Sequence, residues 1–198
     1  MHERIIGLYE ENAGAWDEAR GRELDDRQWF DRFTSLLPPG ASVLDLGCGS
    51  GEPVARHLIE SGYRVTGVDS SPSLIAMCRE RFLNGEWLVG DMRGLDLGRR
   101  FDGILAWHSF FHLHFDAQRA MFPRFATHAA SGAALMFTSG PQHGEAIGDW
   151  QGEPLYHASL DPDEYRGLLH TNDFGVVSFQ AGEPATYGPS VWIARKVS

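Results

Sequence analysis

The chain has 198 residues, of which 42% are hydrophobic, so it is long enough for one α/β domain with a sizeable core, and this composition argues against disorder. No apolar run approaches the ~18 residues that span a bilayer, so we expect no membrane-spanning segment. The net charge is −10 and the basic residues form no cluster beyond Arg99-Arg100, so we expect no nucleic-acid partner. Residues 1–4 lack the basic start of a signal peptide, and only two cysteines are present, which favours a cytoplasmic protein with reduced thiols.

The first forty residues predict helices. Apolar side chains recur at helical spacing over residues 5–16 and again over residues 29–37. A Pro-Pro-Gly sequence at residues 38–40 ends this part of the chain, because proline cannot continue a helix and glycine frees the backbone. We therefore expect a single domain, with N-terminal helices over residues 1–37 and an α/β core over residues 38–198.

Beyond residue 40, short apolar strands alternate with helical patterns. Strands are predicted at residues 43–46, 64–68, 87–89, 101–106 and 133–137, and helices near residues 54–62, 72–82, 117–130 and 161–172. Such alternation indicates a parallel sheet with helices on both faces. Two last strands, at residues 176–179 and 191–194, have no helix between them and should pair antiparallel. Residues 139–160 lack clear periodicity and are predicted as a long loop of the kind that often acts as a lid.

A glycine-rich turn follows the first strand. Gly47 and Gly49 let the backbone turn tightly and approach a ligand, and Gly51 permits close packing of the next helix. Glu52 stands where a dinucleotide fingerprint has Gly or Ala, and its carboxylate would repel a pyrophosphate at the helix N-terminus. Asp45, just before the glycines, likewise favours a cationic ligand over a pyrophosphate.

The next two strands also end in polar groups at the same edge of the sheet. Asp69 ends the second strand about 20 residues beyond the glycines, the spacing at which an acid can bind ribose hydroxyls. Asp91 ends the third strand, where its carboxylate can accept from an adenine amino group while the Met92 amide meets a ring nitrogen. Because ligands of doubly wound sheets bind at the carboxyl ends of the strands, these groups and the glycine turn indicate one nucleoside site.

Together these motifs resemble those of the class I S-adenosylmethionine-dependent methyltransferases, in a small bacterial group similar to the ubiquinone-biosynthesis type. The resemblance covers residues 37–196 and is most specific over residues 43–113. It implies a Rossmann-like, doubly wound α/β sheet of seven strands, mostly parallel with one antiparallel strand near the C-terminal edge. It also implies that the N-terminal helices close over the cofactor as a cap. S-adenosylmethionine carries positive charge on its amino group and sulfonium, which agrees with the acid at Asp45.

The resemblance also implies which residues contact the cofactor. The expected contacts are Gly47, Cys48 and Gly49 along the methionine moiety, Asp69 at the ribose, Asp91 and Met92 at the adenine, and Tyr9, Trp16, Arg20, Asp45, Ser70 and Trp107 elsewhere around it. From the cap, Arg20 would bind the methionine carboxylate. Tyr9 and Trp16 could instead be no more than a stripe of core residues, since their spacing is helical.

Candidate residues for the methyl acceptor follow the fourth strand and lie within residues 139–160. His108, His112 and His143 are the catalytic candidates, because an imidazole can take a proton from an acceptor near neutral pH. A general base is needed only if the acceptor must lose a proton, so these histidines could also merely line a pocket. His108 and His112 would share a face of a helix and could then hold a metal, but no further ligand accompanies them at fixed spacing, and we expect no metal.

The sequence therefore favours an S-adenosylmethionine-dependent methyltransferase that acts on a small molecule, because it has neither a basic groove nor a large insertion for a macromolecule. Three alternatives stay open. The chain could bind the cofactor or its demethylated product without turnover, it could be a nicotinamide-dependent oxidoreductase on a related sheet, or its N-terminal helices could serve a dimerising role. We expect a monomer or a weak homodimer.

Overall fold

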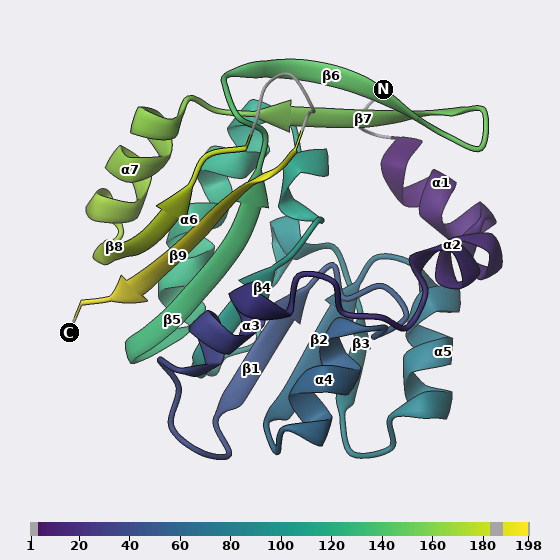
Figure 1. Cartoon of the computed structure of the whole chain (residues 1–198), viewed down its shortest axis with the longest axis horizontal. Coiled ribbons are helices and arrows are strands. Elements are labelled where there is room, and N and C mark those ends of the chain that lie inside the picture. Colours follow the sequence, from purple (N-terminus) through teal and green to yellow (C-terminus); the bar gives the residue numbers. More distant parts are fainter. Residues whose placement is uncertain (1–3, 183–187, 198) are drawn as a thin grey trace.

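The structure is a computed structural model, and it describes residues 4–182 and 188–197. Seven strands form one sheet in the order β3-β2-β1-β4-β5-β9-β8 (Figure 1). They are β1 (Ser42–Leu46), β2 (Arg64–Asp69), β3 (Glu86–Val89), β4 (Phe101–Ala106), β5 (Ala129–Ser139), β8 (Phe174–Gln180) and β9 (Ser190–Lys196). Strands β1 to β5 pair in parallel, so their carboxyl ends lie at one edge, and the strand order reverses between β1 and β4. The predicted doubly wound sheet is confirmed.

Strand β9 is the antiparallel strand of this sheet. It lies between β5 and β8 and pairs antiparallel with both, which confirms the pairing expected of the last two strands. Because β9 is covered on both faces, Trp192 and Ile193 are both buried, whereas Val177 on the edge strand β8 is exposed. The connection between these strands, which contains glycine and proline, includes residues 183–187, which lie outside the described residues.

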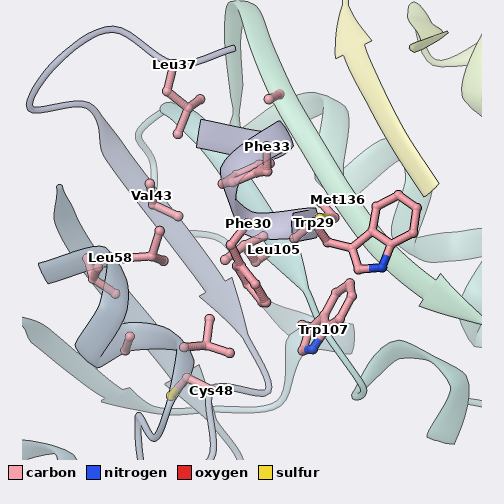
Figure 2. Packing of buried hydrophobic residues seen from close by; sticks show 14 of the residues in the cluster. Trp29, Phe30, Phe33, Leu37, Val43, Cys48, Leu58, Leu105, Trp107 and Met136 are labelled. Atoms are coloured by element: carbon pink, nitrogen blue, oxygen red, sulfur yellow. The ribbon is translucent and has the colours of Figure 1, made fainter. Parts of the chain in front are cut away.

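Helices cover both faces of the sheet. The helices α3 (Arg27–Thr34), α4 (Val54–Glu60) and α5 (Pro72–Arg81) pack on one face, and α6 (Phe115–His128) and α7 (Pro162–Thr171) pack on the other. Figure 2 shows Phe30 and Phe33 of α3 among the core residues Val43 and Leu105. Burying each of these rings contributes about 1.5–3 kcal/mol, so α3 is part of the sheet packing. Within the described residues, no helix is long and apolar enough to cross a membrane.

Residues 139–160 do not form the predicted loop. They contain a β-hairpin, β6 (Gly144–Trp150) and β7 (Glu153–Ser159), that forms a separate two-stranded sheet. The turn between the strands is Gln151-Gly152, and both residues have positive φ, as a two-residue hairpin turn requires. Strand β6 is largely exposed on both faces, so its sequence shows no apolar alternation and the prediction was wrong.

Two N-terminal helices and this hairpin meet above the carboxyl edge of the sheet (Figure 1). The helices are α1 (Ile5–Glu11) and α2 (Ala13–Arg20), and we call them the cap. Ile5 of α1 packs with Tyr156 and Ala158 of β7, and the rings of Trp16 and Trp150 lie 5.6 Å apart. The cap and the hairpin are therefore joined by apolar contacts above the carboxyl edge of the sheet, where the glycine turn and the strand-end acids lie.

Candidate active site

One pocket opens at the carboxyl ends of β1 to β4, under the cap. All the residues predicted to contact the cofactor line this pocket, which we call the cofactor pocket. His108 and His112 line it as well, and His143 does not. The fold thus gathers side chains and backbone from four strand ends and two cap helices around one space, as the strand-end motifs predict.

Gly47 begins the turn after β1 and needs to be glycine for two reasons. Its φ is +75°, a conformation that other residues rarely adopt. A Cβ atom at this position would also lie 2.3 Å from the Cβ atom of Ser109, on the segment that follows β4. The amides of Gly47 and Cys48 both donate to the carbonyl of Val68 in β2, at 2.7 and 3.2 Å. The turn is therefore fixed against two neighbouring strand ends.

The Asp69 carboxylate, at the end of β2, joins the glycine turn to α5. It accepts hydrogen bonds from the amides of Gly49 and Ser71, each at 2.9 Å. Burial raises the pKa of Asp69, while these amide donors oppose the rise. Asp69 thus orders the pocket wall in addition to facing the pocket.

Asp45 places a second acid in the same pocket. It is 3% exposed, and burial together with the charge of Asp69 raises its pKa to about 7. Arg20 of the cap opposes this rise through its positive charge and also lines the pocket. Two acids at adjacent strand ends therefore give the pocket a negative potential that a cationic ligand would relieve.

Glu52 does not act as the sequence argument supposed. Its carboxylate is fully buried and accepts from Arg56 at 2.9 and 3.1 Å, and Arg22 of the chain beyond α2 lies 3.6 Å away. Because two arginines neutralise it, Glu52 would contribute little repulsion toward a pyrophosphate. The preference for a cationic ligand rests on Asp45 and Asp69 instead.

Asp91 and Met92, at the end of β3, line the far side of the pocket. The Asp91 carboxylate caps the short 3-10 helix η2 (Met92–Gly94) by accepting from the Arg93 amide at 2.9 Å, and it also binds the Arg93 guanidinium. Burial opposes ionisation of Asp91, but the hydrogen bonds from Arg93 lower its pKa. The acid is therefore ionised and held at the pocket wall by the arginine.

Trp107, directly after β4, carries a buried donor without a protein acceptor. The residue is 6% exposed, its ring packs against Phe30 at 5.0 Å, and it lies at the edge of the core cluster in Figure 2. In the described part of the chain, its indole Nε1 has no hydrogen-bond partner. Since buried N–H groups are nearly always paired, a ligand acceptor in the adjoining cofactor pocket would satisfy it.

The cap is fastened over the pocket by acids that the sequence did not single out. Glu10 of α1 accepts from the Ser73 amide at 3.1 Å and from the hydroxyls of Ser71 and Ser73, at the N-terminus of α5. Asp17 of α2 forms a bidentate pair with Arg81 of α5 at 2.6 and 2.8 Å. Neither acid belongs to a local motif, so only the tertiary structure shows their function as fasteners.

Both ring nitrogens of His112 have hydrogen-bond partners. It lies in the 3-10 helix η3 (Phe110–His112), where its Nδ1 is 2.8 Å from the Tyr156 carbonyl and its Nε2 is 2.9 Å from the Tyr9 hydroxyl. Since a carbonyl only accepts, Nδ1 carries the proton and Nε2 accepts from Tyr9. Burial lowers the pKa of His112 to about 3, so its ring stays neutral and orients Tyr9 over the pocket.

His108 lies where the cofactor pocket meets a second cavity. Its φ is +50°, a strained value for a residue other than glycine, and its amide donates to the buried Thr138 hydroxyl at 2.9 Å. Asp26, the N-cap residue of α3, makes no side-chain cap bond, and its Oδ2 is 3.7 Å from His108 Nε2. The His108 imidazole lowers the pKa of Asp26, so the pair sets an ionised carboxylate beside the ring.

The second cavity lies under the hairpin and is lined by residues of β6 and β7, the end of β5 and the η3 segment. We call it the hairpin cavity. His108 lines both cavities, and among the described residues no other does so. His143 lines only the hairpin cavity, and its ring stacks on Phe115 of α6 with the centroids 4.7 Å apart.

The structure does not arrange the histidines as metal ligands. The segment with His108 and His112 is a turn followed by η3, so the two do not share a face of an α-helix, and His112 is engaged as described above. Among the residues that the structure describes, no group of three or more His, Cys, Asp or Glu could hold a metal ion.

Residues 43–132 match a family model described as a methyltransferase domain. Over 93 residues the chain is 39% identical to the dTDP-3-amino-3,6-dideoxy-alpha-D-glucopyranose N,N-dimethyltransferase of Streptomyces fradiae. That alignment covers 46% of this chain and 36% of the relative, so the matched stretch spans about a third of the relative's length.

Solved structures share the whole fold at low sequence identity. The CcbJ methyltransferase of Streptomyces caelestis superposes with a TM-score of 0.77 at 19% identity, and the match covers 98% of each chain. The Burkholderia thailandensis 1,6-didemethyltoxoflavin-N1-methyltransferase has a TM-score of 0.73 at 23% identity, over 100% of this chain and 87% of that one. Its structure holds 1,6-didemethyltoxoflavin and S-adenosylhomocysteine.

The strand order, the glycine turn after β1 and the pocket above it define the class I Rossmann-like methyltransferase fold. The match of residues 43–132 to a methyltransferase domain and this fold agree with the class I S-adenosylmethionine-dependent methyltransferases that the sequence motifs predicted.

Proposed function

We propose that the chain transfers a methyl group from S-adenosylmethionine to a nitrogen or oxygen atom of a small molecule. The observation that carries this proposal is the cofactor pocket itself, in which Asp45, Asp69 and the turn at Gly47 meet under one cap. The names of the relatives, which are methyltransferases of an amino sugar and of a toxoflavin precursor, support a small-molecule acceptor.

The residues present fit S-adenosylmethionine. The acids Asp45 and Asp69 suit its positive charge and its ribose hydroxyls, and the turn at Gly47 admits a ligand against the backbone. Arg20 and the unpaired Trp107 Nε1 would provide donors for its carboxylate. Asp91 with Met92 would hold the adenine, and Cys48, Gly49 and Ser70 would complete the wall.

S-adenosylmethionine supplies an electrophilic methyl group, which passes to the acceptor with release of S-adenosylhomocysteine. The cap residues Tyr9 and Trp16 would exclude water from the pocket, and His112 would hold Tyr9 in place. His108 is positioned to take a proton from the acceptor, and the Asp26 carboxylate would stabilise the imidazolium that results. His143 would line the acceptor side without touching the cofactor.

A calorimetric titration with S-adenosylhomocysteine, followed by mass spectrometry of a metabolite panel incubated with isotope-labelled S-adenosylmethionine, tests this function. We expect binding and one labelled product. No heat at millimolar ligand would refute the cofactor site. Binding without any labelled product would favour the alternative of a non-catalytic binding protein.

The cellular setting completes the proposal. We propose that the protein works in the cytoplasm as a monomer or weak homodimer without a nucleic-acid partner. Its two cysteines, Cys48 and Cys78, are free and buried, and its net charge is −10. Light scattering would test the oligomeric state, and a stable higher oligomer would contradict it.

A further inference from the structure

We propose that the methyl acceptor is a phenol, whose aromatic ring lies in the hairpin cavity against the rings of Phe111 and His157 and whose hydroxyl is methylated beside His108. The inference rests on the proposed methyl transfer and adds to it the chemical class of the acceptor. Its evidence is a row of rings that leads from the cofactor pocket into the hairpin cavity, the small residues beside that row, and the proton acceptor at its start.

Three rings form a continuous row along the wall of the hairpin cavity. His108, at the junction of the two cavities, has its ring centroid 5.9 Å from that of Phe111. The Phe111 centroid lies 5.0 Å from that of His157, and these two residues line the hairpin cavity but not the cofactor pocket. The row therefore leads from the place of the proposed methyl transfer into the acceptor side.

The His157 ring is an uncharged surface at neutral pH. Burial lowers the pKa of His157, and the nearby His108 acts in the same direction. The ring is also held in place by the His112 ring, whose centroid lies 4.9 Å away with an angle of 34° between the two planes. A neutral imidazole fixed in this way presents a π surface, as Phe111 does, and such rings favour offset or edge contacts with a further aromatic ring.

The hairpin leaves space beside these rings. In the register of β6 and β7, Ala146 pairs with His157, so their side chains share one face of the hairpin. Gly144 and Gly148, two residues to either side of Ala146, lie on that same face, and all three line the hairpin cavity. Glu145 lies on the opposite face. Between residues 144 and 148, β6 therefore projects nothing larger than a methyl group on the side of the His157 ring, which leaves room for a flat ligand.

A phenol also explains the pair at the start of the row. Its hydroxyl has a pKa of about 10, as in tyrosine, so His108 with the Asp26 carboxylate 3.7 Å away can take this proton, whereas an aliphatic alcohol is too weak an acid. The phenolic oxygen then forms the O–C bond to the methyl carbon as the C–S bond breaks and its electron pair stays on sulfur. The products are an aryl methyl ether and S-adenosylhomocysteine, and His108 returns its proton to solvent.

Two probes with the same carbon skeleton test the preference for an aromatic ring, on protein saturated with S-adenosylhomocysteine, which prevents turnover. The probes are 2-naphthol and its saturated analogue decahydro-2-naphthol, each titrated by calorimetry. We expect 2-naphthol to bind at least ~5-fold more tightly, because one aromatic contact is worth up to a factor of about 10 beyond the area that it buries. A smaller ratio, or no binding of 2-naphthol, would overturn the inference.

Variants place the preference at the row of rings. Phe111→Leu keeps an apolar side chain but removes the ring, so it should weaken 2-naphthol binding ~5-fold and leave decahydro-2-naphthol within ~2-fold. Phe179→Leu is the matched control, because Phe179 is a partly buried phenylalanine on β8 that lines neither cavity, and it should change neither affinity. The same 2-naphthol affinity in the two variants, or an equal loss of both probes in Phe111→Leu, would contradict the proposal.

The labelled product from the metabolite panel gives an independent check. We expect its NMR and mass spectra to place the label in a methoxy group on an aromatic ring. A label on nitrogen or on an aliphatic oxygen would overturn this inference and still support the proposed function. Failure of S-adenosylhomocysteine to bind, or the absence of any labelled product, would instead refute the proposed function.

Discussion

The two cavities that meet at His108 are built in different ways. The cofactor pocket is formed by strand ends, and backbone amides hold its acid Asp69 in place. The hairpin cavity is lined mainly by an outlying two-stranded sheet and the segments beside it, so side chains on a hairpin form much of its wall. Backbone amides are present whatever the side chain, so the first construction holds its ligand in the same position when side chains change. The second leaves the acceptor site free to vary through side chains while the donor site is kept.

The largest effect should come from His108, where the two cavities join. In His108→Gln we expect kcat to fall ~10²- to 10⁴-fold, the usual contribution of a general base, while the affinity for S-adenosylhomocysteine stays within about 3-fold. Asp26→Asn should reduce kcat less, because the base remains. Steady-state kinetics and calorimetry measure both quantities. An unchanged kcat in His108→Gln would show that the acceptor needs no base at this position.

Asp69→Ala should damage the cofactor pocket alone. The change leaves the amides of Gly49 and Ser71 without their acceptor, at a cost of about 1–3 kcal/mol each, so S-adenosylhomocysteine affinity should fall ~100-fold. Asp96→Ala, which removes an exposed acid, serves as the control for net charge. Equal affinities of the two variants for S-adenosylhomocysteine in a calorimetric titration would show that Asp69 does not contribute to cofactor binding.

Gly47→Ala separates steric fit from backbone strain. Its methyl group would meet Ser109 at 2.3 Å, and its φ of +75° is unfavourable for alanine. We expect a loss of ~3 kcal/mol in unfolding free energy and at least ~10-fold in cofactor affinity. Gly98→Ala is the matched control, since Gly98 has φ +61° and open space around it, and should lose only ~1 kcal/mol and no affinity. Equal losses of stability in both variants would mean that the contact with Ser109 is unimportant.

Asp45→Asn tests the charge of the cofactor pocket through pH. The pKa of Asp45 is about 7 in the fold, above its ordinary value near 4, so between these values the folded chain holds a proton that the unfolded chain has lost. The carboxyl therefore destabilises the fold by up to about 1.4 kcal/mol per unit of rising pH in this window. We expect Asp45→Asn to raise Tm near pH 8 but not near pH 4, and to weaken binding of S-adenosylmethionine ~10-fold. A Tm gain that is independent of pH would contradict the assignment.

The smallest effects should come from removing single tyrosine hydroxyls, one at the cofactor pocket and one on the hairpin. Tyr9→Phe removes the donor to His112 and should weaken cofactor binding ~2- to 10-fold, the worth of one hydrogen bond. Tyr156→Phe removes the donor to Glu145 on the hairpin and should leave cofactor binding unchanged, because Tyr156 does not line the cofactor pocket. Calorimetric titration of S-adenosylhomocysteine into both variants checks this contrast, and equal losses of affinity would show that the hydrogen bond from Tyr9 to His112 has no special part in cofactor binding.

Most of the sheet and the cofactor pocket could be predicted from the sequence because their signals are local. A glycine at residue 47 and acids at residues 45, 69 and 91 each follow a buried strand, so strand polarity alone brings them to one edge. The resemblance implied one antiparallel strand near the C-terminal edge, and the structure confirms it as β9, which lies between β5 and β8. The structure supplies the physical reason for Gly47, a φ of +75° and no room for a Cβ atom beside Ser109.

The acceptor side could not be predicted to the same extent because it depends on contacts distant in sequence. Strand β6 has two exposed faces and no apolar alternation, and its turn, Gln151-Gly152, is not a strong hairpin signal such as Asn-Gly. Asp26 reaches His108 across 82 positions of the chain, and no local pattern marks it. Glu52 misled the electrostatic argument because that argument left out its neutralising partners, Arg56 one helical turn away and Arg22 30 positions away.

A crystal structure with S-adenosylhomocysteine bound tests the central claim, that His108 stands between donor and acceptor. The account predicts the ligand in the cofactor pocket, with its ribose at Asp69 and its sulfur beside His108, facing the hairpin cavity. A sulfur directed away from His108, or S-adenosylhomocysteine bound in the hairpin cavity, would contradict it.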